Sequence, residues 1–101
     1  MRHAYVYIIS NKSHRIYVGW TTDLLRRVHE HKTKKYPSSF TARYHFDRLV
    51  WFQVLDTPDA AEKRERALKR MLRAEKVALI QAMNPNWLDL TARLDLLRLL
   101  E

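Results

Sequence analysis

Apolar positions along this chain fall into three short runs that are typical of β-strands. Residues 4–9 and 15–20 are rich in Val, Ile and Tyr, a composition that favours extended structure. The polar connection at residues 10–14 has the length of a hairpin loop, so the two runs predict a β-hairpin. Residues 49–55 are almost continuously apolar, which predicts a central strand covered on both faces.

A first helix is predicted directly after the hairpin. Thr22 and Asp23 both have side chains that accept hydrogen bonds from the free N–H groups at a helix start. Apolar residues at helical spacing supply its buried stripe, namely Leu24, Leu25 and Val28. We expect this helix to fray at residues 33–35, ahead of a loop marked by proline and serines at residues 36–39.

The second half of the chain is predominantly helical in pattern. A turn with a proline near the first helical position, at residues 56–59, indicates a helix start. Residues 60–73 are rich in strong helix formers, and residues 74–83 continue the pattern after a bend expected near Arg73. The inner face of this helical stretch is expected to consist of Ala61, Leu68, Met71 and Leu72.

The end of the chain contains a stop signal, an anchor and one more helical pattern. Asn84-Pro85-Asn86 should end the preceding helix, and Trp87-Leu88 is expected to pack back onto the core as an anchor. Residues 90–100 resemble a last amphipathic helix. The order strand, strand, helix, strand, helix, helix, helix predicts an α+β domain with helices on a small mixed or antiparallel sheet. No repeat or linker divides the chain, so we expect a single domain over residues 1–101.

Charge and composition narrow the class of partner. The chain has 19 Lys and Arg against 11 Asp and Glu, a formal net charge of +8, which favours polyanions, with nucleic acid ahead of anionic membranes. The alternative is a soluble protein whose positive charge serves no binding function. The absence of cysteine excludes disulfides, thiolate metal sites and a cysteine nucleophile. No signal peptide or membrane-spanning run is visible, so we expect a cytoplasmic protein without membrane attachment.

Reactive side chains concentrate in the hairpin and the helix after it. Tyr7 and Tyr17 lie one on each predicted strand, and Gly19, the only glycine, lets backbone or ligand approach closely. Arg27 and His31 are four residues apart and therefore share a helical face. Taken without any family pattern, the tyrosines are better interpreted as ordinary strand aromatics and His31 as a surface side chain.

The chain resembles the GIY-YIG nuclease superfamily. Tyr5-Val6-Tyr7 corresponds to the first family tripeptide and Tyr17-Val18-Gly19 to the second, and the spacing from Gly19 to Arg27 and His31 follows the family pattern. Further matching segments resemble a small single-domain bacterial subgroup, of the UPF0213 type: Phe40-Thr41, Tyr44, residues 47–50, 64–65, 68–69, 79–80 and 84–90. The resemblance covers roughly residues 4–90 and implies a small three-stranded, mainly antiparallel sheet flanked by helices.

The resemblance implies an endonuclease that cleaves DNA phosphodiesters with Mg²⁺ or Mn²⁺, in DNA repair or processing. It implies that Glu65 binds the metal, although that residue alone would be taken for a surface ion-pair partner. It further implies that Tyr17 acts on the attacking water, with a metal-bound hydroxide as the alternative base. Tyr7 and Arg27 would surround the scissile phosphate. His31 would complete the set and is able to accept or relay a proton.

Basic residues near these positions are expected to contact the nucleic-acid backbone, namely Arg26, Lys32, Lys34, Lys35, Arg43 and Lys69. For Arg26 a merely solvated helix face is the better reading. Three positions depart from the family pattern: Tyr5 replaces a glycine, Met71 replaces a tryptophan, and Trp20 replaces a smaller residue. All the polar positions that the family uses for chemistry are filled.

Two other functions are compatible with the sequence. The first is a nucleic-acid-binding module with little or no intrinsic cleavage that a partner recruits, because no separate DNA-binding domain is present. The second is a structural or partner-binding protein that uses the Leu-rich helix at residues 90–100, which would alternatively form a homodimer contact or dock on the core. A protein partner that supplies specificity is compatible with either.

Overall fold

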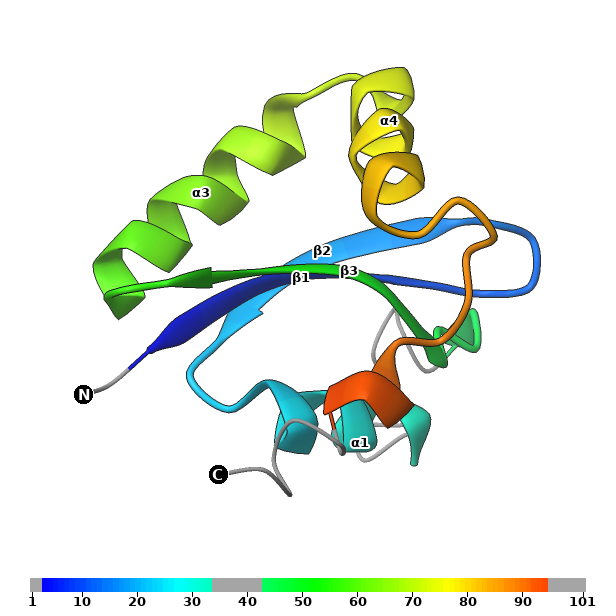
Figure 1. Ribbon diagram of the computed structural model, residues 1–101, viewed down its shortest axis with the longest axis horizontal. Coiled ribbons are helices and arrows are strands. Elements are labelled where there is room, and N and C mark those ends of the chain that lie inside the picture. Colours follow the sequence, from blue (N-terminus) through cyan, green and yellow to red (C-terminus); the bar gives the residue numbers. More distant parts are fainter. Residues whose placement is uncertain (1–2, 34–42, 95–101) are drawn as a thin grey trace.

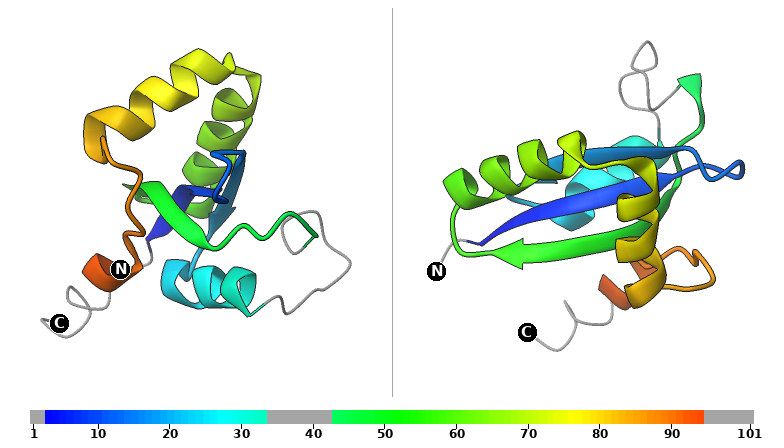
Figure 2. Two further views of the ribbon diagram at one scale, coloured as in Figure 1. Left: turned by 90° about the vertical axis from the view of Figure 1, so that its right-hand side faces the viewer. Right: turned by 90° about the horizontal axis from the view of Figure 1, so that it is seen from above.

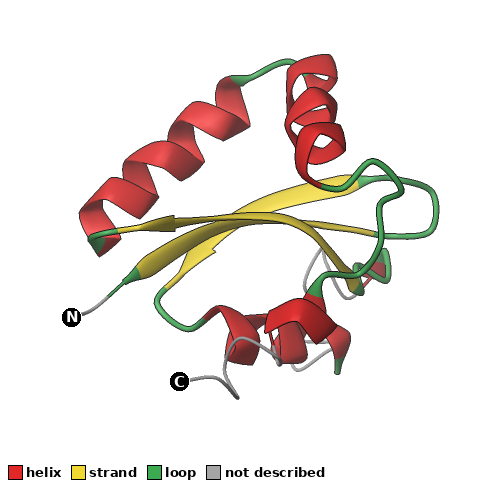
Figure 3. Cartoon of the chain, in the orientation of Figure 1, coloured by secondary structure: helices red, strands yellow, loops and turns green. Residues whose placement is uncertain are grey.

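The computed structural model describes residues 3–33 and 43–94 of the chain. Its elements are β1 (Ala4–Ser10), β2 (Ile16–Thr21), α1 (Leu24–Lys32), β3 (Arg48–Leu55), α3 (Pro58–Arg70) and α4 (Arg73–Met83). Residues 91–94 add a further helical turn. The predicted order of strands and helices is therefore confirmed up to this turn, and the α+β class is confirmed with it (Figures 1 and 3).

The sheet is antiparallel throughout, with strand order β2-β1-β3. The prediction that residues 49–55 form a central strand is wrong, because β1 occupies the centre and β3 lies at an edge. Leu49, Val50 and Trp51 are nevertheless buried, while Val54 is half exposed. The apolar run thus reflects helices packed over both faces of the first half of β3, and coverage of that kind does not require a central position.

A β-bulge lets β3 follow the twist of β1. Ile8 pairs with Trp51 and Ile9 pairs with Leu49, so Val50 is the extra residue on β3. A bulge of this kind bends its strand and increases the local twist. Side chains before and after Val50 are thereby directed into different layers of the core.

Two hydrophobic layers lie on opposite faces of the sheet (Figures 1 and 2). One face packs against α3 and α4, and its buried residues include Val6, Ile8, Val18, Leu68 and Ile80. The other face packs against α1 and the final turn, and its buried residues include Tyr7, Ile9, Leu24, Val28, Phe46, Leu49 and Leu90. The hairpin strands therefore present alternate residues to each layer, as the two-residue period of a strand requires.

The long helical stretch breaks slightly earlier than its sequence pattern suggests. α3 follows Thr57, whose hydroxyl accepts from the N–H of Ala60 at 3.1 Å, as the turn signal predicted. α3 ends at Arg70 and α4 starts at Arg73, so the break precedes the predicted bend. Leu72 lies in this break with an exposed side chain (71 %), and its N–H donates to the Glu75 carboxylate at 2.9 Å. The placement of Leu72 on the inner face is therefore wrong, whereas Leu68 is fully buried.

The segment after α4 is fastened to the sheet by Asn84. Its amide donates to the carbonyls of Val50 and Leu88, at 3.2 and 2.7 Å, and its carbonyl accepts from the N–H of Leu88. Trp87 is buried, as predicted for the anchor, whereas the prediction is wrong for Leu88, which is 62 % exposed. The rest of the helix predicted at residues 90–100, and the loop predicted at residues 36–39, lie outside the described residues. In the described ranges, no helix has the length and apolar character needed to cross a membrane.

Leu68 and Leu72 provide a matched test of this core. We expect Leu68→Ala to lower the free energy of unfolding by about 2–5 kcal/mol, because a buried leucine is replaced by a cavity. Leu72→Ala should change it by less than about 0.5 kcal/mol, since the side chain is exposed. Urea denaturation monitored by circular dichroism measures both values. Equal losses for the two variants would contradict the position of the helix break.

Candidate active site

The candidate site is centred on the buried hydroxyl of Tyr7. The Tyr7 side chain points from β1 toward α1 and is 1 % exposed. Arg27 Nε donates to the phenolic oxygen at 3.3 Å, and that oxygen lies 3.1 Å from Nε2 of His31. Because Arg27 supplies one donor to the oxygen, the phenolic O–H is free to donate to His31. In the tautomer of neutral His31 that carries its proton on Nδ1, Nε2 accepts from the Tyr7 hydroxyl.

Burial keeps both members of this hydrogen bond neutral. It raises the pKa of Tyr7 to about 12, with the Arg27 hydrogen bond and charge acting in the opposite direction. Burial also lowers the pKa of His31 to about 4, and the charge of Arg27 lowers it further. Transfer of the Tyr7 proton to His31 is consequently unfavourable in the resting site. His31 is thus better suited to hold the Tyr7 hydroxyl than to relay a proton.

Gly19 provides the space that the Tyr7 ring occupies. The two residues are direct cross-strand partners in the β1–β2 pair. A Cβ added at Gly19 would lie 2.5 Å from the Tyr7 hydroxyl oxygen and 2.6 Å from Cζ, which is far inside van der Waals contact. The glycine is therefore required by the close approach of a side chain.

Glu30 fixes the orientation of Arg27 and was not identified from the sequence. Its Oε1 accepts from Nη1 of Arg27 at 3.2 Å, and Arg26 Nε lies 3.6 Å from Oε2. Burial alone would lower the pKa of Arg27, but the hydrogen bonds and charges of Tyr7 and Glu30 raise it above its ordinary value. The guanidinium therefore stays charged beside Tyr7. The signal in the sequence was the spacing of three between Arg27 and Glu30 on a helix.

Tyr17 lies on the same face of the sheet as Tyr7 and adjoins this group. Its ring centroid is 6.1 Å from that of His31, and its edge contacts Phe46 with centroids 6.4 Å apart. The ammonium of Lys69, from α3, lies 5.7 Å from the Tyr17 ring centroid. Tyr17 belongs to β2, an edge strand. Side chains from α3, on the opposite face, therefore reach it around that edge.

Glu65 approaches the site from α3. Its side chain is 17 % exposed, and Oε1 lies 3.4 Å from the ammonium of Lys69. Its charge contributes to the raised pKa of Tyr7, as expected for a carboxylate near the phenol. The structure thus brings Tyr7, Arg27 and His31 into direct contact, with Glu65 on the far side of the β2 edge.

Glu65 is the carboxylate around which a divalent cation would have to bind. Among the described residues, no group of three or more His, Asp and Glu side chains is arranged to hold a metal ion. Mg²⁺ is commonly held by one or two carboxylates, with water and substrate phosphate completing its octahedron. The carboxylate of Glu65, which is 17 % exposed and paired with Lys69, fits that mode of binding. It does not fit a site that relies on protein ligands alone.

The basic residues expected to contact nucleic acid have different surroundings. Arg26 is largely exposed beside Glu30, and Arg43 is exposed. Lys32 forms an ion pair with Asp89, which also accepts from the N–H of Leu49 and from Thr91. Burial opposes ionisation of Asp89, but these hydrogen bonds outweigh it and lower the pKa of the carboxyl. Lys34 and Lys35 lie outside the described residues.

The three-stranded antiparallel sheet with helices on both faces is an α+β fold, and the family that the chain matches identifies it as a nuclease-type domain. The model of the GIY-YIG catalytic domain matches residues 3–78, and the chain belongs to the GIY-YIG family. That family membership implies nucleic acid as the general class of substrate. The further expectation of a single domain over residues 1–101 stays a prediction.

Several relatives of similar length match this chain over most of its sequence. A UPF0213 protein of Syntrophus aciditrophicus is 37 % identical over 81 residues, which cover 80 % of this chain and 92 % of that protein. A UPF0213 protein of Haloquadratum walsbyi is 36 % identical over 76 % of this chain and 85 % of its own. The solution structure of a UPF0213 protein from Bacillus halodurans has a TM-score of 0.53 at 29 % identity, covering 84 % of this chain and 89 % of that one.

The contact between Gly19 and Tyr7 predicts the effect of a single methyl group. We expect Gly19→Ala to lower the free energy of unfolding by about 1–3 kcal/mol, because the Tyr7 ring must move to make room. In a Tyr7→Leu background the same substitution should cost much less, since the clashing hydroxyl and ring end are gone. A double-mutant cycle from denaturation curves measures this difference. Equal costs in the two backgrounds would show that the contact does not constrain Gly19.

The depressed pKa of His31 predicts how stability depends on pH. Unfolded His31 takes up a proton near pH 6.5, whereas folded His31 does so only near pH 4. Its contribution is therefore fully present above pH 6.5 and is lost as the pH falls to about 4. His31→Gln should flatten this part of the curve of unfolding free energy against pH. His29→Gln, an exposed change on the same helix, is the control and should leave the curve unchanged.

Proposed function

We propose that this protein is a metal-dependent endonuclease that hydrolyses phosphodiester bonds in DNA. The observation that carries the proposal is the meeting of the Tyr7–Arg27–His31 cluster with Tyr17 and Glu65 at one edge of the sheet. A net charge of +8 supports a polyanionic substrate. Membership of a family of nuclease-type catalytic domains supports the reaction class. A role in DNA repair or processing in the cytoplasm is part of the same proposal.

Arg27 and Tyr7 act on the phosphate in this proposal. Arg27 stays positively charged and is held by Glu30 and Tyr7, so it is oriented before substrate arrives. Such a fixed cation stabilises charge that develops on phosphate oxygens in the transition state. Tyr7 remains a neutral phenol and holds the guanidinium, while His31 anchors the phenol from its other side.

Tyr17 and Glu65 act on the attacking water and on the cation. When bound, Mg²⁺ or Mn²⁺ would supply Lewis-acid stabilisation of the phosphate and activate water. Glu65 would hold that ion, and its own ion pair with Lys69 keeps the carboxylate in place. Tyr17 orients the water or takes its proton, and the Lys69 ammonium lies 5.7 Å from its ring centroid.

Glu65 and Glu62 provide a matched test because they lie on the same helix. Glu65→Gln should lower metal-dependent cleavage by roughly 100-fold or more, since it removes the proposed metal ligand. Glu62 forms an exposed ion pair with Arg66 at 2.7 Å, and Glu62→Gln should leave cleavage near the wild-type rate. The assay follows supercoiled, branched and single-stranded DNA, and matching RNA, with Mg²⁺ and with Mn²⁺.

Two results of this panel would change the proposal. Cleavage that survives Glu65→Gln would show that another group holds the cation. Tight, salt-dependent binding without turnover on any substrate or metal would instead favour the nucleic-acid-binding module. A preference for RNA over DNA would retain the chemistry and change the substrate. Light scattering on the same samples would show whether a homodimer forms.

A further inference from the structure

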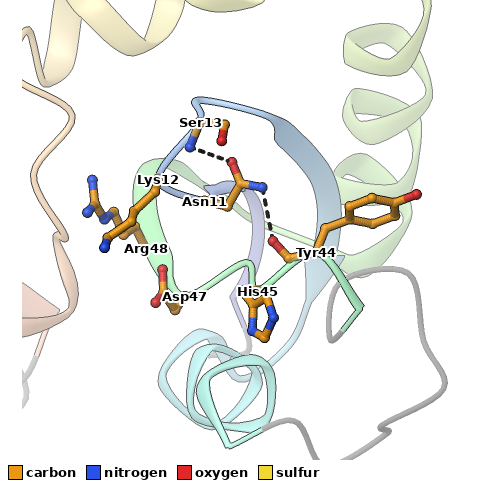
Figure 4. A pocket seen from close by; sticks show the side chains of 7 residues that line it. All are labelled: Asn11, Lys12, Ser13, Tyr44, His45, Asp47 and Arg48. Carbon is orange, nitrogen blue, oxygen red and sulfur yellow. Dashed lines mark hydrogen bonds between the residues drawn. The ribbon is translucent and has the colours of Figure 1, made fainter.

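A groove lies beside the candidate active site, at the tip of the β1–β2 hairpin. It has a volume of about 400 Å³ and is formed by the hairpin connection together with the segment that leads into β3 (Figure 4). We call it the hairpin groove and define it by its lining residues: Asn11, Lys12, Ser13, Tyr44, His45, Asp47 and Arg48. None of these residues has a role in the function proposed above.

Asn11 holds the two walls of the hairpin groove together. Its side-chain carbonyl accepts from the N–H groups of Ser13 and Arg15, each at 3.0 Å. Its amide donates to the carbonyl of Tyr44 at 2.9 Å, across to the other wall. Asp47 adds a backbone bond from its N–H to the carbonyl of Ser10 at 3.2 Å. The groove is therefore a structured feature, fixed by one side chain that spans both loops.

Lys12 and Arg48 place two cations on one side of this groove. Arg48 is the first residue of β3 and is the cross-strand partner of Ser10, two residues before Lys12. Figure 4 shows their side chains extending to the same side. Across residues 3–33 and 43–94, neither forms an ion pair. Asp47 is the single acidic residue in the lining. Two adjacent cations with free donors are suited to an anion that bonds to both.

The Tyr44 wall of the groove adjoins residues that contact the candidate active site. Arg15 directly precedes β2 and stands two residues before Tyr17 in the chain. The guanidinium of Arg15 lies over the Tyr44 ring, 4.3 Å from its centroid. Phe46, from the wall that carries Tyr44, packs edge-on against Tyr17. A polymer chain that leaves the site at Tyr17 in this direction therefore meets the Tyr44 wall first, with Lys12 and Arg48 on the opposite side of the groove (Figure 4).

We propose that the hairpin groove binds a backbone phosphate of the nucleic acid that flanks the scissile phosphate, with Lys12 and Arg48 as its donors. The proposal rests on the proposed function for the nature of the ligand. Contacts of this kind fix the register of the strand without reading its sequence. The groove would thereby determine which phosphodiester lies next to Tyr17 and Arg27.

The test measures binding, so that it does not depend on cleavage. All variants carry Glu65→Gln, and fluorescence anisotropy with a labelled oligonucleotide is recorded over a range of salt concentrations. Lys12→Gln with Arg48→Gln should weaken binding by about tenfold and reduce the slope of log K against log[salt] by about 1.5–2. Lys63→Gln with Arg66→Gln removes the same charge from exposed positions on α3 and is the matched control. Lys12→Arg with Arg48→Lys keeps both charges and should bind as tightly as the protein with the unchanged groove.

Different results separate this proposal from the proposed function. If the Lys12 and Arg48 double variant binds like the α3 control, with the same slope, the groove is not a phosphate site. The endonuclease proposal is unaffected by that outcome, because it depends on cleavage by the wild-type protein. Amide chemical shifts of Lys12 and Arg48 should move on addition of the oligonucleotide. Saturation by inorganic phosphate, without movement on oligonucleotide, would indicate a free-phosphate site and overturn the proposal.

Discussion

The hydroxyl of Tyr7 is a polar group buried within an apolar layer, and much of the domain is arranged to satisfy it. A buried hydroxyl without partners costs free energy comparable to a lost hydrogen bond. Arg27 and His31 supply those partners from α1, on the same helical face. Gly19 supplies the space from β2. One side chain therefore couples the strand pairing, the helix position and the neutral state of His31.

The candidate site is divided between the two faces of the sheet. α1 contributes Arg27 and His31 beneath the sheet, whereas Glu65 and Lys69 extend from α3 above it, and β2 lies between them at an edge. An edge strand has only one neighbour, so side chains from both layers meet around it. A central strand would have kept the two groups apart. The position of β2 in the strand order is thus what makes a shared site sterically feasible.

Local patterns predicted most of this fold, because strand alternation, the Thr57 cap and the break after α3 depend on nearby residues. The strand order was not predictable from the apolar run at residues 49–55. An edge strand that is buried on both faces has the same apolar pattern as a central strand. For the site, helical spacing alone related Arg27 to His31. The contribution of Glu65, and the hydrogen bond between Tyr7 and His31, depend on tertiary packing that no local pattern encodes. Family resemblance supplied Glu65, and the structure supplied the partners of Tyr7.

The alternation of side chains along β2 has a consequence for how this domain tolerates change. Tyr17 and Gly19 face the candidate site, whereas Ile16, Val18 and Trp20 contact the opposite core layer. A shift of the β2 register by one residue against β1 would exchange the two sets and place Tyr17 in the hydrophobic layer that packs against α3 and α4. A variant that keeps this register therefore also keeps Tyr17 and Gly19 on the side of the candidate site. The packing of Val18 and Trp20 in one core layer thus fixes on which side of the sheet Tyr17 stands.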